Sequence, residues 1–299
     1  MRPVNTPLAV ACLLVNAFFW GLSWWPFKEL EHLGLHPLWA TAIVYGLAFV
    51  LIALWCVWRQ MDWHAWRRHP WLWALVVASG LTNVGFNWAV TVGDVVRVVL
   101  LFYLMPAWSV AVAWLLLGER PGKPALLRLV LALTGLFIVL KRPDMAWPVP
   151  ENLADGLALL GGLSFAVTNV LLLKLRDTPE ASRMLAMFGG GTLMASFTAM
   201  LGLMTGVVHT GAAPAGAWVP LLGMLTLAFL LGNLALQYGA ARLAAHTTAL
   251  VMLSEVVFAS VSSVILGAAQ WDSRTGTGGA LILMAALLSV LPGQRKETP

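Results

Sequence analysis

Residues 83–88 read Asn-Val-Gly-Phe-Asn-Trp, and residues 233–238, which lie 150 positions later, read Asn-Leu-Ala-Leu-Gln-Tyr. In both segments two amide side chains stand four residues apart, and an aromatic residue follows the second amide. Any two apolar helices can be aligned somewhere, but paired amides at the same spacing are harder to obtain by chance. The two segments therefore predict an internal repeat.

The match extends beyond these segments. In the same ungapped register Pro106 falls on Val256, and at a slightly different offset residues 20–23 (Trp-Gly-Leu-Ser) correspond to residues 165–168 (Phe-Ala-Val-Thr). The predicted repeat therefore relates most of the first half of the chain to the second half.

The repeated segments lie in a very apolar chain. Hydrophobic residues make up 60% of the 299 positions, mean hydropathy is +0.83, and only 31 residues are charged, where an average soluble domain of this length has roughly 75. This composition excludes a water-soluble globule, a nucleic-acid-binding domain and a disordered chain. The two cysteines lie in apolar stretches without histidine or acidic neighbours, so we expect no disulfide, no metal site and no cofactor.

The charged residues divide the chain into ten apolar stretches, each about as long as a bilayer-spanning helix requires. The expected spans are Pro7–Phe27, Pro37–Trp58, Trp71–Gly93, Val95–Leu117, Pro124–Leu140, Gly156–Leu173, Met184–Val208, Trp218–Tyr238, Leu243–Gly267 and Gly276–Leu291. The sequence thus predicts an all-α integral membrane protein of ten transmembrane helices. The stretches at Gly161-Gly162 and Gly189-Gly190-Gly191 are expected to be close helix contacts.

Each half contains five of these spans, and because five is odd, the second half enters the membrane from the opposite side. We therefore expect two inverted five-helix repeats, residues 1–142 and 153–299, joined by a loop at 143–152. Inverted repeats are a transporter architecture in which the substrate site lies near the bilayer midplane, between the halves.

The basic residues predict the orientation. Thirteen of the 18 Lys and Arg residues lie on the side of the two termini and five on the other side, which places both termini in the cytoplasm. Six of the 16 tryptophans flank the second loop, as an interfacial aromatic belt does. The net charge of +5 is therefore explained by membrane topology, and no nucleic-acid partner is expected.

The tandem halves resemble the EamA repeats of the drug/metabolite transporter superfamily. The resemblance rests on Phe19-Trp20-Gly21 with Lys28 after the first span, on Leu104-Met105-Pro106, and on Leu117-Gly118-Glu119-Arg120 at the end of the fourth. The closest comparison is with bacterial ten-span exporters of amino acids, including aromatic amino-acid exporters. The resemblance implies a bacterial inner-membrane protein with a central cavity lined by the first, third, fourth, sixth, eighth and ninth spans.

The second half departs from the family pattern. The usual Glu-Pro pair of the ninth span reads Glu255-Val256, and the usual Leu-Gly-Glu ending reads Leu266-Gly267-Ala268. Without that proline, no proline kink is expected in the ninth span.

Polar side chains at bilayer depth are candidates for a substrate path, because burying them without a partner is unfavourable. Asn16, Trp20 and Ser23 lie on one face of the first span, where they form either a cavity wall or interhelical packing contacts. The two amide pairs suit a substrate that needs hydrogen bonds from both halves, and the aromatic residues serve either for stacking or as lipid-facing rings. The full candidate set is Asn16, Trp20, Ser23, Asn83, Asn87, Trp88, Tyr103, Trp108, Phe165, Asn169, Asn233, Gln237, Tyr238 and Glu255.

Glu255 is the acidic residue that lies well inside a span. A buried carboxylate is either protonated, paired or open to a water-filled cavity. One interpretation makes Glu255 a proton-coupling or ammonium-binding group, and the other has it satisfied locally by Ser254 or a neighbouring helix. Near the start of the fourth span, Asp94 and Arg97 have the spacing of a local ion pair.

These patterns predict a secondary transporter, with no catalytic residues, that exports a small organic metabolite by alternating access. Its partners would be the lipid bilayer, a small-molecule substrate such as an amino acid, and protons as a coupling ion; a monomer or weak dimer is expected. The alternatives are a proton-coupled exporter of drugs or nucleobases and an integral membrane enzyme acting on lipid. The best interfacial cluster for such an enzyme, Asp62 and His64 with His69, lacks a partner nucleophile. A membrane sensor or scaffold is a further alternative, although it would not require paired amides.

Overall fold

Helices account for the regular structure of the residues that the computed structural model describes, which are 6–61, 65–93, 95–141, 150–206, 208, 215–268 and 272–290. Most of the expected connecting loop 143–152 lies outside these ranges, as do Asp62, His64, Asp94 and the cations Arg2, Arg142, Arg295 and Lys296. Within the described residues no strand occurs.

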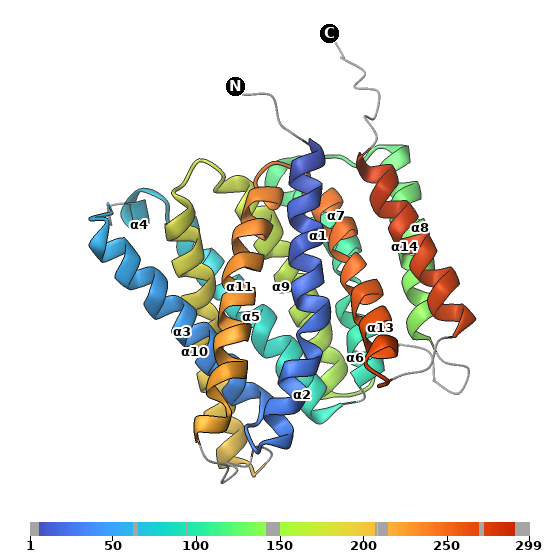
Figure 1. Ribbon diagram of the computed structural model, residues 1–299. Helices are drawn as coiled ribbons and strands as arrows, with labels where there is room; N and C mark the ends of the chain where they lie inside the picture. Colours follow the sequence, from blue (N-terminus) through green and yellow to red (C-terminus); the bar gives the residue numbers. More distant parts are fainter. Residues whose placement is uncertain are drawn as a thin grey trace.

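The helices follow one another in the order of the expected spans. The first half contains α1 (Thr6–Leu22), α2 (Trp24–His32), α3 (Pro37–Trp58), α4 (Ala65–Arg68), α5 (Trp71–Val92), α6 (Val95–Phe102), α7 (Met105–Leu117) and α8 (Lys123–Leu140). The second half contains α9 (Leu153–Lys174), α10 (Glu180–Met204), the short 3₁₀ helix η1 (Ala215–Ala217), α11 (Val219–Ala240), α12 (Ala245–Met252), α13 (Ser254–Ile265) and α14 (Ser273–Val290). Helix α1 begins and α14 ends at the same face of the bundle, which we call the terminal face (Figure 1).

Eight helical segments of the described chain are long and apolar enough to cross a bilayer, which makes this a multi-pass membrane protein. Of the ten expected spans, α5 and α14 are not among them. Helix α5 carries Thr82, Asn83 and Asn87, which lower its hydropathy, and it packs against the two apolar helices α9 and α10.

Several expected span boundaries differ from the helix ends by three to five residues, and the seventh span shows why. The seventh span was expected to begin at Met184, after the charged residues, but α10 begins at Glu180. Arg183 lies inside the helix, only 2% exposed, and its guanidinium donates to the carbonyl of Leu175. A charged side chain that finds a hydrogen-bond partner can be accommodated inside a helix. The charged residues Glu180 and Arg183 therefore do not mark the end of the loop before α10.

Three of the expected spans are broken near their middle. The first is interrupted at Ser23, the fourth at residues 103–104 and the ninth at Leu253. In the first two, a proline lies three residues or fewer beyond the break, and its missing N–H leaves a carbonyl one turn earlier without a partner: Pro26 leaves Leu22, and Pro106 leaves Phe102.

The ninth span was expected to lack a proline kink, yet it is broken without one. The backbone N–H of Val256 donates to the carbonyl of Leu253 at 3.1 Å, a three-residue spacing that tightens the turn. The hydroxyl of Ser254 donates to the carbonyl of Val251 at 2.7 Å, a carbonyl that in a continuous helix accepts from the N–H of Glu255. A serine hydroxyl thus takes a helical carbonyl at the break in the second half, and this break, at Leu253, lies 150 residues after Tyr103.

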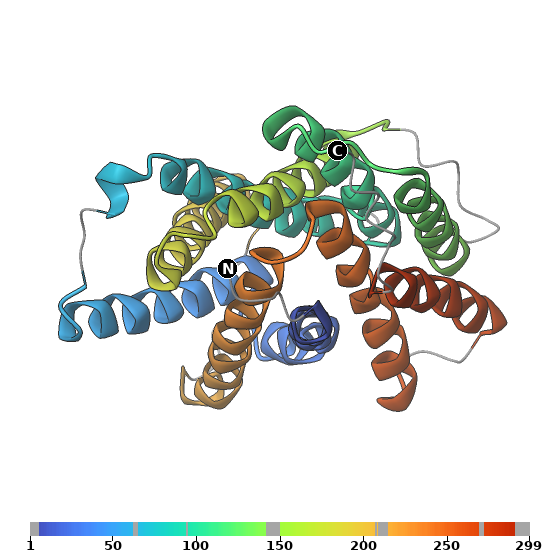
Figure 2. The same cartoon turned by 90° about the horizontal axis from the view of Figure 1, so that it is seen from above.

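The helix packing exchanges partners between the two halves. Helix α1 packs against α11 and α13, and α9 of the second half packs against α5 and α7 of the first. Helices α3 and α10 pair at one end of the bundle, and α8 and α14 pair at the other, as the view from above shows (Figure 2). Interchanging the two halves maps these contacts onto one another or onto themselves.

Glycine permits the closest of these contacts, as expected for Gly161-Gly162 and for the run at 189–191. A side-chain carbon placed on Gly85 of α5 would lie 2.7 Å from the carbonyl oxygen of Leu157 in α9. On the other side of α5, a carbon on Gly190 of α10 would overlap the backbone of Val76. Helix α5 is therefore held between α9 and α10 at backbone contact distance.

Replacing Gly190 by alanine is expected to lower the stability of the protein by about 1–3 kcal/mol, because backbone cannot move aside as a flexible side chain does. Thermal unfolding in detergent measures the effect. Gly223→Ala in α11 is the matched control, since no atom lies within 4 Å of the added carbon. Equal melting temperatures for the two variants would contradict a close α5–α10 contact.

Candidate functional site

A cavity of about 90 Å³ lies where the broken helices meet the middle of α5, α9 and α11. Its lining comes from both halves of the chain. The lining residues are Trp20, Tyr45, Ser79, Thr82, Asn83, Phe86, Asn87, Phe102, Tyr103, Met105, Phe165, Thr168, Met187, Asn233, Leu236, Met252 and Glu255.

The helix breaks place side chains in this cavity. Tyr103 and Met105 flank the break between α6 and α7, and Met252 and Glu255 flank the break between α12 and α13. Tyr103 and Glu255 both line the cavity, one from each half. The two broken helices therefore contribute a phenol and an acid to the cavity wall.

The four repeated amides do not have equivalent surroundings. In the first half Asn83 donates to the carbonyl of Ser79 at 2.9 Å, and Asn87 donates to the hydroxyl of Thr41 at 3.2 Å. In the second half the two amides bond to each other, since Gln237 donates to the Asn233 side-chain oxygen at 2.7 Å.

Gln237 consequently lies behind Asn233 and does not line the cavity, while the other three amides do. The sequence repeat therefore conserves the amide spacing of the two segments but not the bonding of the side chains.

Two groups of aromatic rings line the cavity. Trp20 stacks on Phe229 with ring centroids 4.4 Å apart, and the Tyr45 ring meets the same phenylalanine edge-on. The second group contains Phe102, which contacts Phe86 at 4.9 Å and Phe165 at 6.2 Å. The lining thus combines flat apolar surfaces with amides, hydroxyls and a single carboxyl group.

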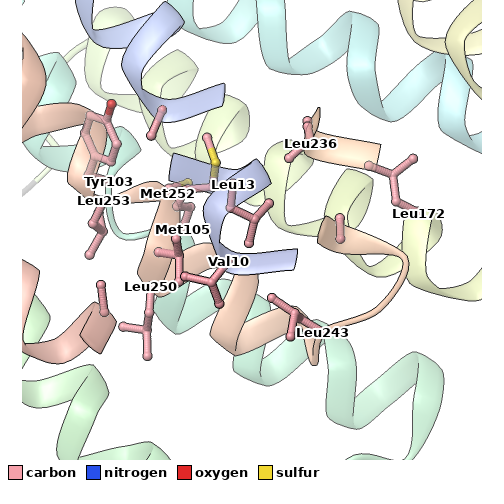
Figure 3. Close-up of a cluster of buried hydrophobic side chains, with 14 of the residues drawn as sticks. Val10, Leu13, Tyr103, Met105, Leu172, Leu236, Leu243, Leu250, Met252 and Leu253 are labelled. Carbon is pink, nitrogen blue, oxygen red and sulfur yellow. The ribbon is translucent and has the colours of Figure 1, made fainter. Parts of the chain in front are cut away.

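Buried apolar side chains separate the cavity from the terminal face. This set, which we call the plug, packs between α1, α9, α11 and α12, with Leu13, Leu172 and Leu250 each at most 1% exposed. Figure 3 shows Val10, Leu13, Leu172, Leu243 and Leu250 among them, with Met105 and Met252 close by. The plug closes the cavity on the side of the terminal face.

On the opposite side of the bundle, an ion pair joins the two halves. The guanidinium of Arg97 in α6 donates to both carboxylate oxygens of Asp155 in α9, at 2.9 to 3.1 Å. Asp155 is 1% exposed and also accepts from the backbone N–H of Glu151, whose own carboxylate lies 3.3 Å from Arg97. The expectation for Arg97 named only Asp94, which lies outside the described residues. The sequence reasoning missed the partner in the second half, because the fold brings these residues together across 58 positions.

Comparison with known families supports a transporter assignment for the first half. Residues 7–141 match the EamA-like transporter family. The matched region covers α1 to α8, which include the lining residues from Trp20 to Met105.

Comparison with solved structures supports the fold of the whole chain. A chain entitled "Crystal structure of protein" matches with a TM-score of 0.74 at 16% sequence identity, covering 100% of this chain and 99% of that one. At this identity the match concerns the fold alone. Comparison with curated proteins finds no match.

Half of the predicted candidates line the cavity. These are Trp20, Asn83, Asn87, Tyr103, Phe165, Asn233 and Glu255, and the first four belong to the EamA-like region. Asn16, Asn169 and Gln237 are fully buried beside the lining. Ser23 donates to the carbonyl of Trp20 and thereby belongs to the helix break.

The remaining three candidates are not among the lining residues. Trp108 packs in a separate apolar cluster with Ala166 and Val170 of α9. Tyr238 carries the guanidinium of Arg242 over its ring, 3.6 Å from the centroid. Trp88 is half-buried, one residue beyond Asn87. A role in substrate binding for any of the fourteen residues stays a prediction.

The sequence reasoning missed several lining residues. Tyr45 belongs to the second span, which the family resemblance did not place at the cavity, although a tyrosine in the middle of an apolar span was an available signal. Ser79 precedes Asn83 by one helical turn, so it was recoverable from the same face of α5. The methionines and phenylalanines carried no such signal, because apolar residues occur on every face of these helices.

Removing Asp155 leaves the Arg97 guanidinium with the exposed Glu151 carboxylate as its charged partner, at an expected cost of about 1–3 kcal/mol. Asp155→Ala should therefore lower the melting temperature. Asp177→Ala serves as the control, because the Asp177 side chain is 91% exposed and lies 3.7 Å from a half-exposed Arg176. A melting temperature for Asp155→Ala equal to that of the control would show that the pair contributes little to stability.

Proposed function

We propose that this protein is a secondary transporter that exports a small organic metabolite across the bacterial inner membrane by alternating access. The observation that carries the proposal is a cavity lined by broken helices from both halves and closed by an apolar plug on one side. Broken helices around a midplane site are the usual construction of transporters with inverted repeats. The match of residues 7–141 to the EamA-like transporter family supports the same conclusion.

The lining favours a neutral amino acid, including an aromatic one, as the substrate. Glu255 is the single acidic residue among the lining residues, and it suits an ammonium group, while the amides suit a carboxylate. The rings around Trp20 and Phe102 offer surfaces on which an apolar side chain can pack. Small-molecule pockets usually measure roughly 300–1,000 Å³, so a cavity of about 90 Å³ has to widen when the substrate binds.

The orientation follows from the predicted topology. If the terminal face is cytoplasmic, as the distribution of Lys and Arg predicts, the plug closes the cytoplasmic side of the path. Export then requires the plug to open toward the cytoplasm, so that the substrate enters, and to close again before release on the other side.

A second candidate function is a proton-coupled exporter of drugs or nucleobases. It is favoured by the placement of Glu255 and Tyr103 at the cavity wall, where a carboxyl group can exchange a proton with bound water. The two candidates differ in substrate and in coupling, and they are separated by the two measurements that follow.

Counterflow in proteoliposomes tests the transport proposal. Labelled amino acids, nucleosides and organic cations are offered to liposomes preloaded with the same unlabelled compound, with and without a pH gradient. We expect exchange of neutral amino acids above the level of protein-free liposomes. Absence of exchange for every compound, in a preparation that unfolds cooperatively, would contradict the proposal.

Replacing Glu255 by glutamine tests proton coupling. If Glu255 carries the coupling proton, Glu255→Gln abolishes accumulation driven by a pH gradient but retains counterflow, because glutamine keeps the size and the hydrogen bonding of the side chain. Glu119→Gln is the control, since Glu119 lies in the loop after α7. Unchanged gradient-driven accumulation in Glu255→Gln would show that Glu255 does not carry the coupling proton.

A further inference from the structure

Five buried polar side chains lie one helical turn from the cavity lining, on the side of the terminal face. Each is four residues away from a lining residue of its own helix, and residues at that spacing share a helix face. In each of the following pairs the buried polar residue comes first and the lining residue second. The pairs are Asn16 with Trp20 on α1, Ser109 with Met105 on α7, Asn169 with Phe165 on α9, Gln237 with Asn233 on α11, and Thr248 with Met252 on α12.

The direction of each helix puts all five on the same side of the cavity. Helices α1 and α12 run away from the terminal face, so that the earlier residue is nearer to that face (Figure 1). Helices α7, α9 and α11 run toward it, so that the later residue is nearer. We call these five residues the polar layer.

The polar layer is completely buried and incompletely hydrogen-bonded. All five residues are 0% exposed. The Oγ of Ser109, the Oγ1 of Thr248 and both polar atoms of the Asn169 amide have no hydrogen-bond partner among the described residues.

In the two remaining residues one amide atom is bonded and the other is not. Asn16 donates to the sulfur of Met252 at 3.3 Å, and Gln237 donates to Asn233. The Asn16 Oδ1 and the Gln237 Oε1 have no partner in the described part of the chain.

Such groups are expensive in a closed apolar environment. A buried polar group without a partner costs about 1–3 kcal/mol, and native proteins contain few of them. Four of the five residues lie on α1, α9, α11 and α12, the helices that form the plug, where Leu13, Leu172 and Leu250 are all at most 1% exposed. Groups that contribute nothing to the closed state are expected to be used in another state of the protein.

We infer that the polar layer is the terminal-side half of the substrate path, where these side chains bind the uncharged polar groups of the substrate and its water when the plug opens. The five residues together present both donors and acceptors, and none of them carries a charge. The layer therefore suits a small solute without net charge, such as a zwitterion or a neutral heterocycle. The inference rests on the proposed alternating access, in which these five residues become exposed when the protein opens toward the terminal face.

The accessibility of cysteines tests this opening without knowledge of the substrate. Cys12 and Cys56 are replaced by alanine, and Ser109→Cys and Thr248→Cys are then probed singly with methanethiosulfonate ethylammonium in proteoliposomes. A minor conformation of a protein is populated at about 0.1–10%. We expect both cysteines to react at that fraction of the rate of Thr82→Cys, because Thr82 lines the cavity and is partly exposed.

Thr198→Cys is the matched control. Thr198 is also 0% exposed, but its hydroxyl donates to the carbonyl of Met194 at 2.8 Å, and it lies on α10, away from the layer. Rates at positions 109 and 248 that are as slow as the rate at position 198 would overturn the inference. This outcome is distinct from failure of the proposed function, which absence of counterflow in the wild-type protein would show.

Apolar substitutions provide the second measurement. Thr248→Val and Asn169→Leu keep the approximate volume but remove unpaired polar atoms, so the melting temperature is expected to stay equal or to rise. Counterflow is expected to fall by about tenfold or more, which corresponds to roughly 1.4 kcal/mol. Thr198→Val loses a bonded hydroxyl and should lower the melting temperature instead. If Thr248→Val and Asn169→Leu destabilise the protein and leave counterflow unchanged, the layer is structural and the inference fails.

Discussion

Backbone hydrogen bonding is the constraint on which the rest of this structure depends. Inside a bilayer every backbone N–H and C=O needs a partner, so the chain crosses as helices, and a helix can be interrupted only where protein or water surrounds the break. The interruptions at Tyr103-Leu104 and at Leu253 adjoin residues that line the cavity, and the lining residue Trp20 lies three positions before the interruption at Ser23. The cavity is found at the same place, because there the helices stop presenting continuous apolar surface to each other.

Close packing around the breaks keeps them inside the protein. Helix α5 lies against α9 and α10 at contacts that glycines make possible, and α1 of the first half packs on α11 and α13 of the second. The halves are therefore interlocked, and neither encloses the cavity by itself. An opening of the plug has to come from a relative movement of these packed helices, because close-packed interiors shift between discrete arrangements rather than deform continuously.

The polar groups of the centre fall into two sets that differ in their partners. Asn83, Asn87 and Ser79 lie at the cavity and are hydrogen-bonded within it. Ser109, Asn169 and Thr248 lie one turn away, on the side of the apolar plug, and their polar atoms have no partner in the described part of the chain. This contrast supports the proposal that the structure is one access state of a transporter, with the terminal side of the path closed.

The sequence by itself determined the helical class, the approximate spans and the spacing of the repeated amides, because these depend on local hydropathy and on residue order. It also pointed to Trp20, Asn83, Asn233 and Glu255, since polar and aromatic residues are conspicuous in apolar spans. Only the tertiary structure decided that Gln237 bonds to Asn233, that Arg97 pairs with Asp155 and that Ser254 breaks the ninth span. The Arg97–Asp155 pair depends on helix packing across the two halves. The bonds of Gln237 and Ser254 are local, but each side chain has more than one partner within reach along its helix, and only the folded structure shows which one it takes.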